Sequence, residues 1–217
     1  VPEIGFQLQD KAIFGHSPEA KVERNWIEKD GLRQLQTRIT QPDGTELSEE
    51  TMARSLRIAP PMIGIGLLEA IPEDDVLTNA DPDDHDGDGI SGRPVWTIDS
   101  DGERRIGRFG WKAIAASVNQ QSANAYLDDM GLTTATGPDS TMATDGSPAD
   151  ISWEDLDGVS YYTQTLGAPA TAEASQSRVV KQGSALFDQL QCSSCHVPSQ
   201  RTGNNQQAVA NVINDQT

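Results

Sequence analysis

Residues 183–196 read Gly-Ser-Ala-Leu-Phe-Asp-Gln-Leu-Gln-Cys-Ser-Ser-Cys-His, and this stretch is the most informative one in the chain. It ends in Cys192-x-x-Cys195-His196, the spacing typical of covalent attachment of c-type haem. Two thiols three positions apart can each bond to a vinyl group of one haem, and the histidine that follows can bind the iron. The motif predicts haem c tethered by Cys192 and Cys195, with His196 as the proximal iron ligand.

Three other interpretations of the two cysteines stay open. A thioredoxin-like redox pair is typical of a βαβ context, whereas a helix is expected directly before Cys192. A zinc site needs four ligands, and the only other histidines in the sequence are His16 and His85. The third is a chance pair of buried thiols. Because both cysteines of the chain belong to this motif, a framework of disulfides is excluded.

The chain is strongly acidic, with 33 Asp and Glu against 16 Lys and Arg in 217 residues and a net charge of −17. A nucleic-acid backbone would repel such a surface, so we expect no nucleic-acid partner. No stretch approaches the roughly 18 apolar residues of a membrane span. Basic protein partners and bound cations fit the charge better. Only 35% of the residues are apolar, so a haem would add bulk to a thin core.

Turn signals and hydrophobic periodicity predict hairpins and helices. Asp30-Gly31 within residues 22–40, and residues 99–102 between two short apolar runs, predict two β-hairpins. Helices are expected at residues 72–79, 111–130, 152–167 and 177–190, and Ser48 resembles a helix start. Residues 81–92 and 133–150 are expected to be loops.

Gly183, Leu186 and Phe187 before Cys192 resemble the first helix of class I cytochromes c. The expected fold is therefore mainly α and cytochrome-c-like, with much irregular loop and one or two small β-hairpins. A linker of small residues at 168–175 is the expected domain boundary. It would separate a middle region, residues 1–167, from the start of an incomplete haem domain, residues 168–217.

Five aspartates crowd into eight residues of the loop after Ala80: Asp81, Asp83, Asp84, Asp86 and Asp88. Clustered carboxylates repel one another unless a cation lies among them. The alternation Asp84-x-Asp86-x-Asp88-Gly89 is typical of a calcium loop, although Val95 stands where an EF-hand has its last glutamate. The predicted Ca²⁺ ligands are Asp81, Asp84, Asp86 and Asp88. The alternative is a solvated acidic turn that binds no ion.

Several blocks together resemble the bacterial di-haem c-type oxidoreductases, often labelled thiol oxidoreductases and distantly similar to di-haem cytochrome c peroxidases. These blocks are residues 57–73, 81–93, 107–112, 120–121 and 129–131. The family carries two Cys-x-x-Cys-His motifs, and this sequence contains the second one. We therefore expect an internal or truncated portion of a longer protein with a second haem domain.

The resemblance implies electron transfer by a c-type haem protein of peroxidase ancestry, periplasmic or secreted in a bacterium, with a basic redox partner. Glu69 is a candidate acid or base for peroxide chemistry, or else a capping or salt-bridge residue. Trp96 and Trp111 are candidate electron relays, or else core residues. Two other functions stay open: a non-catalytic electron-transfer or binding module, and a calcium-stabilised domain whose two cysteines form a disulfide.

Overall fold

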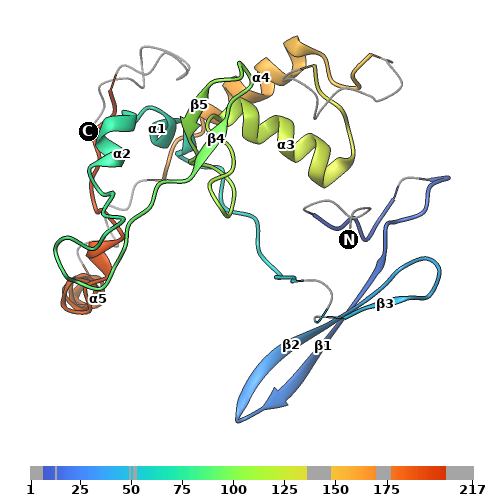
Figure 1. The fold of residues 1–217 in the computed structure, drawn as a ribbon, viewed down its shortest axis with the longest axis horizontal. Coiled ribbons are helices and arrows are strands. Elements are labelled where there is room, and N and C mark those ends of the chain that lie inside the picture. Colours follow the sequence, from blue (N-terminus) through green and yellow to red (C-terminus); the bar gives the residue numbers. More distant parts are fainter. Residues whose placement is uncertain are drawn as a thin grey trace. The chain divides into compact units, whose positions relative to one another are not determined.

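The computed structural model describes residues 7–12, 14–48, 50, 53–135, 148–169 and 177–203. These residues form two antiparallel sheets and five α-helices, with a short 3-10 helix after the last of them (Figure 1). About 29% of the described structure is helical and about 18% is strand. The expectation of a mainly α, cytochrome-c-like fold is therefore wrong. Strands of nine residues form the first hairpin, and two of the helices have only five residues.

The first sheet contains β1 (Lys21–Lys29), β2 (Leu32–Thr40) and β3 (Glu46–Leu47), in the order β1-β2-β3. Asp30 and Gly31 join the first two strands with φ of 55° and 75°, as a type I′ turn requires. The predicted first hairpin is thus confirmed. Its small core lies toward the end away from this turn and contains Ala20, Ile39 and Leu47, with Leu8 and Val22 packed against them.

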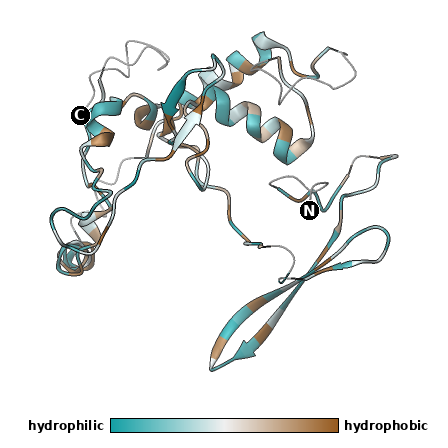
Figure 2. Cartoon of the chain, viewed as in Figure 1, coloured by the Kyte–Doolittle hydropathy of each residue, from teal (hydrophilic) through white to brown (hydrophobic). Residues whose placement is uncertain are grey.

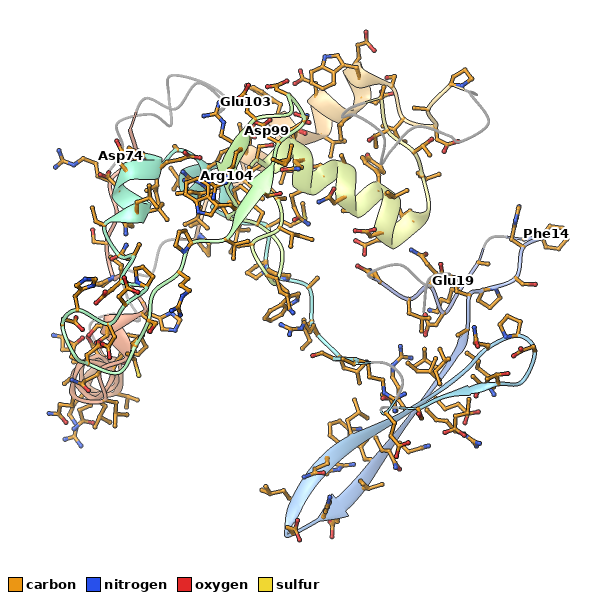
Figure 3. All side chains as sticks on the ribbon, viewed as in Figure 1. Phe14, Glu19, Asp74, Asp99, Glu103 and Arg104 are labelled. Atoms are coloured by element: carbon orange, nitrogen blue, oxygen red, sulfur yellow. The ribbon has the colours of Figure 1, made fainter. Side chains whose placement is uncertain are left out.

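The second sheet pairs β4 (Trp96–Ile98) with β5 (Arg104–Ile106). Asp99 holds the turn between them, because its buried carboxylate accepts the N–H groups of Asp101 at 3.0 Å and Glu103 at 2.8 Å. Figure 3 labels Asp99 and Glu103 beside this hairpin. The second predicted hairpin is therefore confirmed as well.

The helices are α1 (Ile65–Glu69), α2 (Glu73–Leu77), α3 (Val118–Met130), α4 (Trp153–Gln164) and α5 (Arg178–Gln189). Ser152 and Ser177 begin α4 and α5 as N-caps, since their hydroxyls accept the N–H groups of Asp155 and Val180. The helices expected in these two places, and the short one after Pro72, are confirmed. The predicted helix start at Ser48 falls on residues 49, 51 and 52, which lie outside the described residues.

Helix α3 begins seven residues later than the sequence predicted. Gly110 and Ala113 have φ of 78° and 52°, and Phe109 pairs with Ala115, so residues 109–115 form a tight loop. Phe109 and Ala115 are buried in this way against Val118 and the half-buried Ile65. The reversal of the backbone therefore buries Phe109 and Ala115 in the core, although the apolar residues of 111–117 have the spacing of a helix.

The chain divides into two compact units. One contains residues 1–58 and 125–131, and the other contains residues 59–124 and 132–217. The predicted boundary at residue 168 stays a prediction, and residues 170–176 of that linker lie outside the described part. None of the helices that the structure describes is long and apolar enough to span a bilayer.

Candidate functional site

Helix α5 leads directly into a short turn that carries all three residues of the cysteine motif. Gln191 leaves the helix with φ of 59°, and the 3-10 helix η2 (Cys192–Ser194) follows. The N–H groups of Cys195 and His196 both donate to the carbonyl of Cys192, at 3.3 and 3.0 Å. Two free thiols and an imidazole are thereby held on one turn of backbone, with Cys192 partly exposed and Cys195 exposed.

An aromatic contact orients the imidazole of this turn. The ring centroids of Phe187 and His196 lie 5.8 Å apart, and the rings meet edge to face at 63°. Such a contact is favourable for aromatic pairs and restricts rotation of the exposed His196 ring. Phe187, one of the residues that resemble the first helix of class I cytochromes c, therefore lies next to the histidine of the motif.

Helix α5 carries an apolar face that no described part of the chain covers. None of its twelve residues is buried, and its N-cap and the motif after it are also accessible. Exposed large apolar side chains recur at helical spacing along it and just after it: Val179, Val180, Leu186, Phe187 and Leu190. A contiguous apolar surface of this kind is typical of a binding site. Together with the thiols and the imidazole, it fits a large apolar ring system such as haem.

The segment after the motif is held against the loop between α1 and α2, a contact that no local sequence pattern indicates. The N–H of Gly203 donates to the carbonyl of Ala70 at 2.8 Å. A Cβ at Gly203 would lie 2.5 Å from Cγ of Pro72, so this close approach requires glycine. Thr202 beside it is buried. The chain seven residues beyond His196 is thus held against the loop between the two short helices.

Three of the four predicted calcium ligands come together in the acidic loop. Asp81, Asp84 and Asp86 each offer an oxygen, and these atoms all lie within 4.8 Å of one another. Asp88 lies outside this group, and its carboxylate accepts the N–H of Ile90 at 2.7 Å. Oxygen donors at this spacing could hold a hard divalent cation.

Hydrogen bonds within the loop hold these carboxylates in place. The backbone N–H of His85 donates to Asp81 at 3.0 Å, and the Nδ1 of its ring lies 3.0 Å from the same oxygen. These two contacts, led by the backbone one, lower the pKa of Asp81. The N–H of Gly89 donates to Asp84, and Gly89 has φ of 84°. The loop therefore gathers the acidic groups through its own backbone.

One buried carboxylate joins three helices. Glu69 is 1% exposed at the end of α1 and accepts the N–H of Val118, the first residue of α3, at 2.7 Å. Its other oxygen accepts from the side-chain amide of Gln164, the last residue of α4. Burial raises the pKa of Glu69, while both hydrogen bonds and the charge of Arg108 oppose that rise. The capping alternative for Glu69 is confirmed by the bond to Val118.

Neither candidate relay tryptophan is buried. Trp96 is 38% exposed and lies under the guanidinium of Arg104, whose Cζ is 4.0 Å from the ring centroid, and Trp111 is 55% exposed. Core packing therefore does not account for either residue, and their relay role stays a prediction.

Comparison with known proteins gives one match. The family model described as "Di-haem oxidoreductase, putative peroxidase" matches residues 33–153 and 142–216. No curated protein matches the chain, and no solved structure does.

Proposed function

Since the chain belongs to the di-haem oxidoreductase family, we propose that it is a c-type haem protein for periplasmic electron transfer, part of a di-haem oxidoreductase of peroxidase ancestry. The observation that supports this best is the turn after α5. There two free thiols and an imidazole are held within five residues, next to the apolar face of α5. None of the described residues buries that face.

Each residue of this turn has a distinct role in the proposal. Cys192 and Cys195 tether the cofactor through thioether bonds, and His196 binds the iron on the proximal side. The edge-to-face contact with the Phe187 ring holds the imidazole in orientation. The apolar face of α5 would exclude water from one side of the bound haem. Haem, when bound, supplies one-electron redox chemistry at a potential set by its ligands and surroundings.

Covalent attachment tests this assignment directly. The protein, produced with a cytochrome c maturation system, is expected to keep its haem through acid-acetone extraction and to give a pyridine haemochrome spectrum. The double variant Cys192→Ala/Cys195→Ala should lose all extraction-resistant haem. The matched control Ser193→Ala/Ser194→Ala changes the two residues between the thiols and should keep it. Extraction-resistant haem in the cysteine variant would refute the assignment.

Location and the second haem follow from the same chemistry. Haem c is attached outside the bacterial cytoplasmic membrane, so the protein is proposed to be periplasmic or secreted. The family is di-haem, and the 217 residues contain one Cys-x-x-Cys-His sequence. We assign the second haem to another domain of the full-length protein. The intact mass of that protein from periplasmic extract should exceed its polypeptide mass by two haem increments.

Peroxide turnover separates an enzyme from a carrier. The family's description as peroxidases favours reduction of hydrogen peroxide by the reduced full-length protein, with electrons supplied by a basic partner that complements the net charge of −17. Loss of absorbance of a reduced cytochrome donor on addition of peroxide measures this activity. A haem-loaded protein that exchanges electrons with the donor but leaves peroxide unchanged would support the non-catalytic alternative.

Calcium in the acidic loop is a separate part of the proposal. The grouped oxygens of Asp81, Asp84 and Asp86 support it, because like charges this close favour a bound cation. Titration with calcium should show one site and should raise the melting temperature. Asp81→Asn should abolish both effects. Asp88→Asn should leave them unchanged, because Asp88 lies outside the group. Absence of calcium binding by the unaltered chain would leave a solvated acidic turn.

A further inference from the structure

Strand β1 has an open edge along its whole length. Among the described residues it pairs with β2 alone, on one side, and its nine residues form the outer strand of the first sheet (Figure 1). Trp26 in the middle of the strand is 59% exposed, and Leu35 opposite it on β2 is 38% exposed. Figure 2 shows apolar residues interspersed with polar ones along both strands. An open edge of this length is a template for another strand.

The backbone groups that this edge offers can be assigned from the register. Residues of an antiparallel pair alternate between hydrogen-bonded and non-hydrogen-bonded positions. Lys29 and Leu32 flank the two-residue turn, where the hydrogen-bonded pair of a type I′ hairpin lies. The N–H and C=O groups of Arg24, Trp26 and Glu28 therefore point away from β2. A further strand would have to pair through these residues.

The charges of β1 are self-complementary in one antiparallel register. When two copies of the strand meet with Trp26 opposite Trp26, Arg24 faces Glu28 of the second copy and Glu23 faces its Lys29. The two-fold axis repeats both pairs, which gives four contacts between opposite charges. Cross-strand pairs of opposite charge stabilise sheets.

The neighbouring registers that use the same outward groups are worse matched. Centring the pair on Asn25 places Lys21 opposite Lys29, and centring it on Arg24 places two arginines opposite each other. Centring on Ile27 leaves Glu28 opposite Trp26. Like charges directly opposite each other are destabilising, which disfavours the registers centred on Asn25 and Arg24. The register centred on Ile27 has a single kind of opposite-charge pair, Arg24 with Asp30, whereas the register centred on Trp26 has two, so the charge pattern favours the latter.

We propose that β1 is a dimerisation edge, at which two copies of this chain pair antiparallel about Trp26 and join their sheets into one of six strands. Residues 21–40 carry five basic and three acidic side chains, so this hairpin is locally basic and repulsion between two acidic chains is reduced there. Two ion pairs within the chain compete, Arg24–Asp10 at 3.0 Å and Lys21–Glu23 at 2.7 Å. Both pairs are open to solvent, with Asp10 half-buried, and pairs of this kind contribute little to stability.

Sedimentation velocity over a range of concentrations tests the dimer with the full 217-residue chain. Lys29→Glu should raise the dissociation constant of the dimer by about tenfold or more. The two-fold axis places the new glutamate of each copy opposite Glu23 of the other, which makes two contacts between like charges. Lys29 makes no ion pair among the described residues, so the monomer should stay folded. Glu23→Lys/Lys29→Glu restores opposite charges and should restore the dimer. Lys112→Glu makes the same charge change elsewhere and should leave the dissociation constant unchanged.

Amide hydrogen exchange identifies the edge independently. At a concentration that forms the dimer, the N–H groups of Arg24, Trp26 and Glu28 should become protected, whereas those of Asn25 and Ile27 should be protected at every concentration. A chain that stays monomeric, or a dimer that Lys29→Glu does not weaken, would overturn the proposal. Protection of all five amides that does not change with concentration would also overturn it.

Discussion

Replacing Glu69 by alanine removes the acceptor that connects the end of α1 to the start of α3 and the end of α4. The N–H of Val118, a residue with no exposed surface, loses its bond of 2.7 Å, and the side-chain amide of Gln164 loses its bond to the second oxygen. Each buried donor left unsatisfied costs about 1–3 kcal/mol. The two together should lower the free energy of unfolding by about 2–6 kcal/mol.

Chemical denaturation at neutral pH, with the glutamine variant as the matched control, measures this loss. Glu69→Gln keeps one carbonyl oxygen in place, so it should cost less than half as much as Glu69→Ala. For a protein of this size each kcal/mol shifts the melting temperature by about 2–4 °C, so the alanine variant should melt about 4–24 °C lower. Equal stabilities of the two variants would refute the view that hydrogen bonding to the carboxylate holds these helices together.

The pH dependence of stability provides a second test of the same residue. Burial raises the pKa of Glu69 above its ordinary value of 4.5, so the folded state retains this proton to higher pH than the unfolded state does. The contribution of Glu69 is therefore fully present below pH 4.5 and decreases as the pH rises through the folded pKa. The stability of the unaltered chain relative to Glu69→Gln should fall over that interval. A rise instead would show that the hydrogen bonds and Arg108 outweigh burial.

Three further substitutions and one comparison test the packing around these sites. Gly66→Ala should lower the free energy of unfolding by about 1–3 kcal/mol in the same denaturation assay, because its Cβ would lie 2.1 Å from the carbonyl oxygen of Gln164. Gly158→Ala in α4 places its Cβ in open space and should raise the free energy of unfolding by about 0.5–1 kcal/mol. Arg108→Met removes a guanidinium that donates to carbonyls at 2.8 and 2.6 Å around the end of α1, and should lower stability by about 1–3 kcal/mol. Haem attachment should slow amide exchange throughout residues 178–189, and equal exchange with and without haem would show that the cofactor does not cover α5.

Elements with strong local signals could be predicted from the sequence. Asp30-Gly31 favours positive φ at both positions, and Ser152 and Ser177 each supply a hydroxyl to a free N–H three residues later. These interactions join residues close in sequence, so the pattern alone specifies them. The start of α3 could not be found in this way, because Ala113 adopts φ of 52° to satisfy packing with distant residues.

The same distinction applies to the sites. The residues of the cysteine motif are consecutive, and a single turn brings them together, so their proximity could be predicted. Asp88 was grouped with Asp81 from spacing, but its carboxylate accepts the N–H of Ile90 two residues later and lies outside the group. Glu69 and its partners lie 49 and 95 residues apart in sequence, and no local pattern connects them. The bonds from α3 and α4 to Glu69 could therefore be found only in the folded structure.

Helix α5 differs from the other long helices in what stabilises it. Each of α3 and α4 buries at least three residues, whereas α5 buries none of its twelve. A helix of this length is only marginally stable in water, even with a good N-cap, because most helical stability comes from packing of its apolar face. A group that covered this face would therefore supply much of the free energy that orders the helix. Haem tethered at Cys192 and Cys195 would do so from the helix's own C-terminal end, so that cofactor attachment and folding of the site would be one coupled event.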